Sequence, residues 1–242
     1  MDKTMEKQTA FNFKSLRAVN DSYLVVTALT AELPEALPER LLFTGVGKVN
    51  AAHKLTEYLT NNPQIKCVIN FGTAGGAFNV TKGELIKCTT FLQGDMDCGD
   101  MVGGPGITFG DESLVSDVIQ FGSDGSICRT QDQFCESLDG LDLFEHLVMD
   151  NKFNCVDMEA YALAKVCAFM DVDFQCYKYI SDDADGNASD DWQENVSKGE
   201  ELFYKVLQAI RSAVDNMSDL YDLERDDIGI ISNIILKNLT GS

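Results

Sequence analysis

The chain has 242 residues, of which 45% are hydrophobic, and its formal net charge is −20. This length suits one large α/β domain with a sizeable core. Such an acidic surface repels phosphate backbones and anionic lipid, so the composition argues against nucleic acid and membrane partners. No apolar run approaches the roughly 20 residues that a membrane span needs.

The eight cysteines are scattered along the chain, and no two of them have CxxC spacing. Several lie inside apolar runs, which is typical of reduced, buried thiols in a cytosolic protein. The two histidines, His53 and His146, are not near a cysteine pair. Residues 1–20 are polar and mixed in charge, without the apolar core of a signal peptide. We therefore expect no metal site, no cofactor and a cytoplasmic location.

The first half of the chain reads as short strands joined by turns, after a loosely ordered leader at residues 1–21. The β-branched run Tyr23–Leu29 predicts a buried strand, and Leu41–Thr44 predicts a second one. A glycine turn at Gly45–Gly47 leads into a predicted helix over 48–60, where apolar residues have helical spacing. Further strands are predicted at Cys67–Phe71 and Glu84–Phe91.

The second half begins with a glycine-containing segment, Gln93–Gly110, which we expect to be a long loop. Strands are predicted at Ser126–Arg129 and Phe174–Ile180, helices at Val156–Met170 and Glu194–Met217, a polar loop at Ser181–Asp191 and an amphipathic tail at Ile228–Leu239. Short strands alternating with helices favour a layered α/β fold with a largely parallel sheet.

Several polar or glycine-containing segments follow the predicted strands, and ligands of such folds bind beyond the carboxyl ends of strands. Gly45–Lys48 and Gly72–Gly76 could cradle a ligand, although a tight connection is the more common reason for such glycines. A phosphate cradle also needs a basic side chain. Lys48 is the one candidate in the first turn, and no arginine occurs from Leu41 to Ile127. Neither GxGxxG nor a P-loop occurs, so a dinucleotide is not expected.

Four blocks occur in one order along the chain: Thr44–Ala52, Asn70–Gly76, Val156–Ala160 and Ile180–Asp185. Together they resemble the signature blocks of the nucleoside phosphorylase superfamily, and most of all those of its hydrolytic branch, the methylthioadenosine/S-adenosylhomocysteine nucleosidases. The resemblance covers Tyr23 to Met217. It implies a three-layer α/β/α domain at 22–218 around a central mixed sheet, usually found as a homodimer. Residues 219–242 are then a C-terminal extension, which we expect to serve packing or oligomerisation.

The resemblance also implies two catalytic carboxyl groups. Asp182 matches the acid that protonates purine N7, so that the base leaves neutral while the sugar becomes cationic. That acid must keep its proton near neutral pH, which requires a raised pKa. Asp183 and Asp185 compete for this role. Glu32 matches the glutamate that activates water, and the alternative is an exposed turn residue.

Further positions match substrate contacts of the family. Glu159 corresponds to the glutamate that accepts hydrogen bonds from the ribose hydroxyls, although compensation of a helix dipole would also explain it. The other implied contacts are Met158 against the sugar, Phe134 on the purine, Trp192 beside the 5′ substituent, and Thr73, Ala74, Gly75 and Ser181 around sugar and base. For Met158, Phe134 and Trp192 the alternative is ordinary packing.

One departure concerns the connection after Glu32. Typical family members carry a hairpin between this glutamate and the glycine block, whereas only Leu33–Thr44 separates them here. We expect a fold trimmed by this missing hairpin near the N-terminus, with consequences for the placement of Glu32 and for substrate choice.

Three functions remain open on this scaffold. Phosphorylases of the superfamily supply arginines for phosphate, and Thr44–Lys48 and Asn70–Thr73 contain none. The sequence therefore favours a purine nucleosidase over a phosphate-dependent phosphorylase. A non-catalytic nucleoside-binding protein would not need both Glu32 and Asp182. The favoured substrate is a 5′-modified adenosine, such as 5′-methylthioadenosine, S-adenosylhomocysteine or 5′-deoxyadenosine, while a modified purine base stays open.

Overall fold

The computed structural model of the chain describes residues 23–33, 40–99, 105–109, 117–139, 141 and 153–217. The expected leader at 1–21, the extension from residue 219 and the tail Ile228–Leu239 lie outside these residues. Within the described residues, eight strands form one sheet and four helices accompany it. The strands are β1 (Tyr23–Thr27), β2 (Leu41–Phe43), β3 (Cys67–Gly76), β4 (Leu85–Gln93), β5 (Ile119–Gln120), β6 (Ser126–Thr130), β7 (Cys155–Asp157) and β8 (Asp173–Asp182). The helices are α2 (Lys48–Asn61), α3 (Ala160–Met170), α4 (Ala188–Asn195) and α5 (Glu200–Met217).

The sheet is mixed, as predicted. The pairs β1–β2, β1–β3, β3–β8, β4–β6 and β6–β7 are parallel, whereas β3–β7, β4–β5 and β4–β8 are antiparallel. The pairings also close a ring, because β8 is bonded to both β3 and β4, and β7 and β6 link these two strands on the other side. The side chains on the inner face of this ring therefore converge from five strands.

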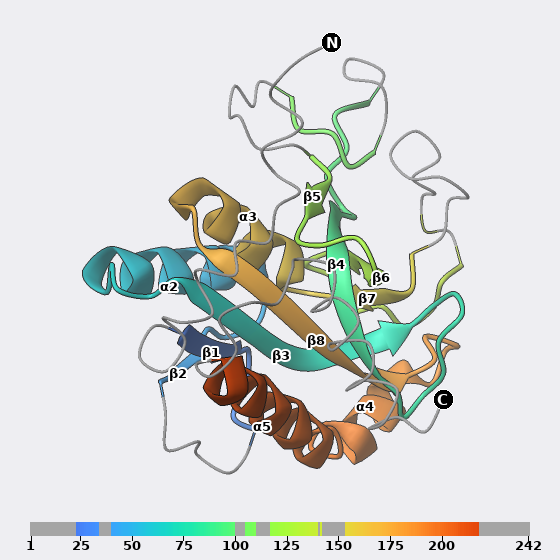
Figure 1. Cartoon of the computed structure of the whole chain (residues 1–242). Helices are drawn as coiled ribbons and strands as arrows, with labels where there is room; N and C mark the ends of the chain where they lie inside the picture. Colours follow the sequence, from blue (N-terminus) through green and yellow to red (C-terminus); the bar gives the residue numbers. More distant parts are fainter. Residues whose placement is uncertain are drawn as a thin grey trace.

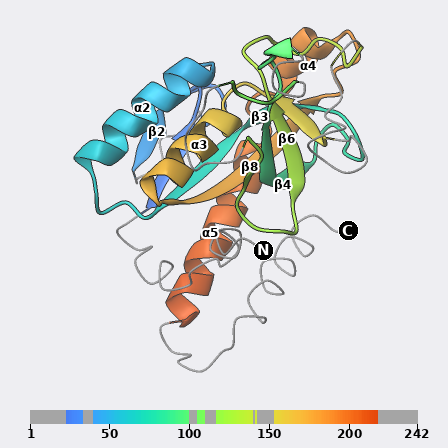
Figure 2. The same cartoon turned by 90° about the horizontal axis from the view of Figure 1, so that it is seen from above.

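Helices cover both faces of the sheet. Figure 1 shows α2 and α3 together on one face and α5 on the other, and Figure 2 shows the same arrangement from above. In β1, Leu24 and Val26 join the core beneath α2 and α3, whereas Tyr23 and Val25 contact the core that contains Phe203 of α5. This alternation follows from the two-residue repeat of a strand that is buried on both faces. The predicted three-layer α/β/α architecture is confirmed.

The helix predicted over Val156–Met170 is wrong at its start. Cys155–Asp157 forms β7, which pairs with both β3 and β6, and α3 begins at Ala160. A strand of three residues is too short to show its own periodicity, so the apolar Val156 fitted the helical pattern of the following segment.

The predicted loop Ser181–Asp191 and helix Glu194–Met217 also need correction. Strand β8 continues to Asp182, and α4 occupies Ala188–Asn195 before α5 starts at Glu200. Helix α4 is one short, polar stretch with little intrinsic helix propensity. The two helices are separated around Gly199, where an added Cβ would lie 2.6 Å from the Cβ of Tyr179.

The short connection after Glu32 leaves β1 paired directly with β2 on one side and with β3 on the other. Within the described parts of the predicted loop Gln93–Gly110, no α-helix or further strand follows the end of β4 at Gln93. No described helix combines the length and the apolar character needed to cross a membrane.

Candidate active site

A cavity of about 250 Å³ opens where β1, β3, β7 and β8 end and where α4 follows β8. This position beyond strand ends is the usual one for ligands of open α/β sheets. All ten residues proposed from the sequence line it: Glu32, Thr73, Ala74, Gly75, Phe134, Met158, Glu159, Ser181, Asp182 and Trp192. They come from segments far apart in the chain, so their convergence depends on the closed ring of strands.

Glu32 lies in the turn after β1 and is only 4% exposed. Its Oε2 accepts hydrogen bonds from Thr27 Oγ1 (2.8 Å) and from the backbone N–H groups of Ala28 and Leu29 (3.1 and 3.0 Å). Its Oε1 accepts from the backbone N–H and the hydroxyl of Thr73, at 2.8 and 3.0 Å. Five donors therefore hold this side chain in one position. The short connection that follows Glu32 does not remove it from the pocket.

Asp182, the last residue of β8, has fewer donors. Its Oδ2 accepts from Ser181 Oγ at 2.8 Å, and its Oδ1 accepts from the backbone N–H of Ala184 at 3.2 Å. Burial raises the pKa of Asp182 above its ordinary value, and the nearby charges of Asp191 and Asp183 act in the same direction. Asp183 and Asp185, the competing candidates, are exposed and do not line the cavity. Asp182 is thus the carboxyl of this segment that best retains a proton.

Glu159 follows β7 and is the N-cap residue of α3. Its Oε1 accepts a hydrogen bond of 2.8 Å from the backbone N–H of Gly47, at the start of α2. Burial raises the pKa of Glu159 to about 8, and the neighbouring charge of Asp157 adds to the effect. With one oxygen bound by Gly47, the group still has acceptor capacity for a ligand in the cavity.

Trp192 connects α4 to the opposite wall of the pocket. Its indole N–H donates to Thr73 Oγ1 at 3.0 Å, and Thr73 Oγ1 in turn donates to Glu32. A chain of two hydrogen bonds therefore links the helix after β8 to the carboxylate after β1. Packing alone would not require this orientation of the indole. The sequence did not indicate this contact, because Thr73 and Trp192 lie in different blocks.

The other predicted residues complete the wall of the cavity. Ala74 and Gly75 belong to β3, Met158 follows β7, and Ser181 comes immediately before Asp182 in β8. Phe134 is 36% exposed, in the loop after β6, so it is available to a ligand at the mouth of the pocket. Gln133, Ser189 and Gln193 also line the cavity, although the sequence did not single them out.

The glycines of β3 allow two carboxyl groups to approach the strand. A Cβ at Gly75 would lie 2.9 Å from Asp182 Oδ1, and a Cβ at Gly72 would lie 3.3 Å from Glu32 Oε1. The segment Gly72–Gly76 was expected to be a turn, but β3 continues through it and pairs with β8. These glycines therefore serve close packing of side chains against an extended backbone.

A buried ion pair beneath the pocket was missed by the sequence reading. Lys178 Nζ in β8 lies 2.8 Å from Asp157 Oδ2, and both side chains are almost fully buried. Asp157 also accepts hydrogen bonds from Thr130 Oγ1 (2.6 Å) and from the backbone N–H of Ala160 (2.8 Å). The pair fixes the end of β7, which carries Met158 and Glu159. The available signal was a lysine inside an otherwise apolar strand, since lysine is seldom buried without a partner.

The described residues that line the cavity include four acidic side chains, Glu32, Asp157, Glu159 and Asp182, and none that is Lys, Arg or His. Lys48, the candidate phosphate ligand, is not in this lining and forms ion pairs with Asp95 and Asp132. The cavity therefore suits a neutral or cationic ligand better than an anion.

The sequence matches one family model and is similar to known proteins. The family model described as "Phosphorylase superfamily" matches residues 25–212. A 5′-methylthioadenosine/S-adenosylhomocysteine nucleosidase of Haemophilus influenzae (strain PittGG) is 32% identical over 170 residues, which cover 64% of this chain and 72% of the relative.

Solved structures match the fold. A Helicobacter pylori methylthioadenosine nucleosidase variant with 5′-methylthioadenosine in its active site has a TM-score of 0.64 and 20% identity, covering 79% of this chain and 98% of the other. A futalosine hydrolase variant of Helicobacter pylori strain 26695 has a TM-score of 0.66 and 19% identity, with coverage of 79% and 99%. At these identities the two structures establish a shared fold.

Proposed function

The chain belongs to the phosphorylase superfamily, and we propose that it hydrolyses the N-glycosidic bond of a purine nucleoside to give free base and free sugar. The observation that carries this proposal is the composition of the pocket. Asp182 and Glu32 have different surroundings, as an acid and a base require, and among the described residues no Lys, Arg or His lines the pocket to hold a second, anionic substrate.

Asp182 acts as the general acid in this proposal. Departure of the purine as an anion is unfavourable, and protonation at N7 lets the base leave neutral. Burial of Asp182 favours the protonated carboxyl, which is the form that can donate. Ser181 Oγ and the Ala184 N–H hold the two carboxyl oxygens in place, so the acid is oriented before the substrate binds.

Glu32 orients and deprotonates the attacking water, and its ionised form stabilises the cationic sugar. Each carboxylate oxygen offers about two lone-pair directions. Three donors contact Oε2, and two donors, both from Thr73, occupy Oε1. One donor must therefore turn away before water can bind. The Thr73 hydroxyl is the donor that can do so, because it can rotate and lines the cavity, whereas Thr27 is fully buried.

Glu159 binds the ribose. Its carboxylate can accept hydrogen bonds from two vicinal hydroxyl groups, and charge-assisted bonds of this kind contribute roughly 1.5–3 kcal/mol each. Met158 and Phe134 supply apolar and aromatic surface beside it for the sugar and the base.

A neutral 5′-modified adenosine suits the remaining part of the pocket. Val46, Leu29 and Trp192 supply apolar surface, which favours a methylthio or deoxy group over a charged 5′ end. A 5′-phosphate would meet four acidic side chains and no cation in the described lining, so nucleotides are disfavoured. The same charge distribution disfavours phosphate as the nucleophile, and with it the phosphorylase alternative.

The protein is further proposed to be a cytoplasmic homodimer. Exposed apolar side chains that line the pocket, Val46 (39% exposed) and Phe134 (36%), and the exposed Val49 (77%) in the first turn of α2 support a partner surface there. The eight cysteines are all free, which fits a reducing compartment. The molar mass in solution, measured by light scattering after size-exclusion chromatography, tests the dimer.

The reaction is tested by base release from 5′-methylthioadenosine, adenosine and inosine, each with and without phosphate. We expect free adenine and free 5-methylthioribose from the first substrate at a rate that phosphate does not change. Product that appears only with phosphate, as a sugar 1-phosphate, would replace the hydrolase by a phosphorylase. Binding without any turnover would instead favour the non-catalytic alternative.

A further inference from the structure

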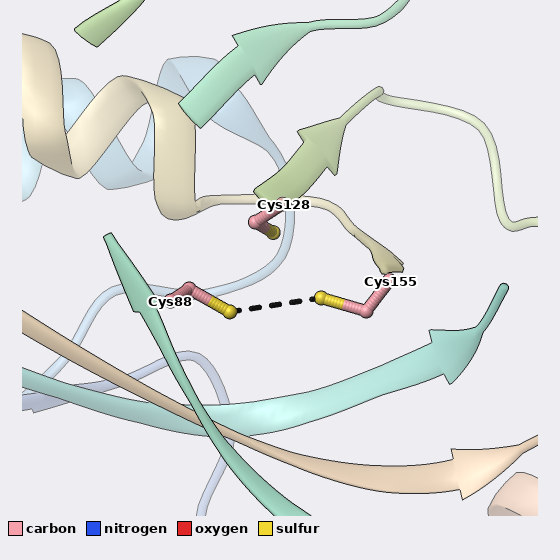
Figure 3. Close-up of side chains that lie close together, drawn as sticks. All are labelled: Cys88, Cys128 and Cys155. Atoms are coloured by element: carbon pink, nitrogen blue, oxygen red, sulfur yellow. Dashed lines mark hydrogen bonds between the residues drawn. The ribbon is translucent and has the colours of Figure 1, made fainter. Parts of the chain in front are cut away.

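Three cysteines far apart in the sequence meet inside the ring of strands. Cys88 comes from β4, Cys128 from β6 and Cys155 from β7, and Figure 3 shows their side chains pointing toward one another. Their sulfur atoms all lie within 4.8 Å of one another, and each residue is at most 1% exposed. Cys176 of β8 is the cross-strand neighbour of Cys88.

The sulfur spacing matches what a thiolate-bound metal ion requires. With metal–sulfur bonds of about 2.3 Å, tetrahedral or trigonal geometry places the sulfurs about 3.8–4.0 Å apart. Cys88 Sγ and Cys155 Sγ are 3.7 Å apart, and the other two separations are at most 4.8 Å. Small changes of side-chain torsion would therefore bring the three sulfurs onto one ion, without movement of the strands.

The surroundings of the three thiols favour a soft cation. The three cysteines and Cys176 belong to the core cluster beneath α2 and α3, and within it Cys128 Sγ lies 3.4 Å from Asp157 Oδ1 while Cys176 is paired with Cys88 across the strands. Thiolate ligands select soft or borderline ions such as Cu⁺ and Zn²⁺ over Mg²⁺ and Ca²⁺. Lys178, paired with Asp157, adds a positive charge beside the thiolates.

We propose that Cys88, Cys128 and Cys155 form a structural site for one thiolate-bound metal ion, Cu⁺ or Zn²⁺. The thiols lose their protons to solvent as the metal–sulfur bonds form, and no oxidation state changes. Because the site is closed, the ion enters before the ring of strands is complete. This site is independent of the proposed nucleosidase reaction, whose groups lie at the end of the ring.

The test measures metal content in the untagged full-length protein. The chain is produced in medium supplemented with Zn²⁺ or, separately, with copper under reducing conditions, and each preparation is analysed by mass spectrometry of metals after gel filtration. We expect about one equivalent of one of the two ions per chain, and the two arms identify which. A metal content near zero in both arms overturns the site and leaves the thiols as apolar packing.

A matched pair of variants localises the ion. Cys88→Ala with Cys155→Ala removes two ligands, whereas Cys67→Ala with Cys167→Ala removes two buried thiols outside the cluster. We expect at least a tenfold loss of bound metal in the first variant and none in the second. Equal metal content in both variants would also overturn the assignment. Should the first variant fail to fold, the wild-type chain is refolded in the presence of Cd²⁺, so that the ion can enter before the ring closes. Bound Cd²⁺ then gives a thiolate charge-transfer absorption band, and absence of that band on bound Cd²⁺ has the same meaning.

Discussion

Glu32 and Asp182 line the same pocket, but the numbers of hydrogen-bond donors around their carboxyl groups differ. At Glu32, five donors surround one carboxylate, two of them from Thr73 of the neighbouring strand. At Asp182, two donors contact a buried carboxyl whose pKa is raised by that burial. The two carboxyl groups thus differ in how many donors hold them, and burial raises the pKa of Asp182. Such a difference in surroundings is what a pocket needs to hold the proposed base and the proposed acid together.

Replacement of Asp182, the proposed acid, should have the largest effect on kcat. Asp182→Asn keeps the size and the contact with Ser181 but cannot protonate the base, so we expect kcat to fall about 10³- to 10⁴-fold. Substrate affinity should change little, because the interaction is made in the transition state. Steady-state kinetics of adenine release measure both quantities. A rate within tenfold of wild type would mean that another group is the acid.

Replacement of Glu32 should lower kcat less than replacement of Asp182. In Glu32→Gln an NH₂ group replaces one carboxylate oxygen and faces hydrogen-bond donors. The side chain therefore loses its charge and some of its hydrogen bonds, and we expect kcat to fall about 10²- to 10³-fold. Exposed Glu194, replaced by Gln, serves as the control for loss of a charge. Kinetics with unchanged kcat for Glu32→Gln would remove Glu32 from the mechanism.

The proposed role of Glu159 predicts that substrate affinity depends on pH. Its pKa of about 8 in the folded protein means that the carboxylate forms only as the pH rises through that value, and the ionised form is the better acceptor for two ribose hydroxyls. Affinity for 5′-methylthioadenosine should therefore rise by roughly tenfold between pH 6.5 and 9. Glu159→Gln, or a 2′-deoxy ligand, should flatten this dependence.

The affinity is measured with the Asp182→Asn variant, in which substrate survives, with fluorescence of the single tryptophan as the signal.

The raised pKa of Glu159 also has a consequence for the stability of the fold. The folded chain binds this proton more tightly than the unfolded chain, whose value is near 4.5, so stability is lost as pH rises from there through 8. Glu159→Gln should consequently raise the Tm more at pH 8.5 than at pH 5, and an equal shift at both would contradict the burial argument.

The smallest effect is expected at Trp192. Trp192→Phe keeps an aromatic ring but removes the N–H that donates to Thr73 Oγ1, so the hydroxyl is less firmly held against Glu32. We expect a change of about two- to fivefold in kcat, with KM for 5′-methylthioadenosine nearly unchanged. Trp192→Ala should raise that KM as well, because it also removes apolar surface. Identical kinetics for wild type and Trp192→Phe would show that the hydrogen bond does not orient Thr73.

Much of this arrangement was predictable from local sequence. Local apolar patterns predicted β1, β2, β3, β4, β6 and β8, although β3 extends beyond its predicted end at Phe71 and the short strands β5 and β7 were not predicted. The ten proposed site residues came from the family resemblance, and they line one cavity because such sheets bring blocks at strand ends together. Contacts between blocks were not predictable. The Lys178–Asp157 pair, the Trp192–Thr73 hydrogen bond and the cysteine cluster join segments whose proximity depends on strand order, which local periodicity does not encode.

The closed ring also bears on how the chain folds. Strands β3 and β8 are neighbours in the ring, although β4, β6, β7 and α3 all lie between them in the chain. Contacts of such long sequence separation must wait for most of the chain to be available, which makes folding slow. During synthesis, β8 leaves the ribosome after the other seven strands of the described sheet, and Asp182 is its last residue. The enzyme therefore acquires its proposed acid in the same step that closes the ring, and a nascent chain that ends before β8 can have neither.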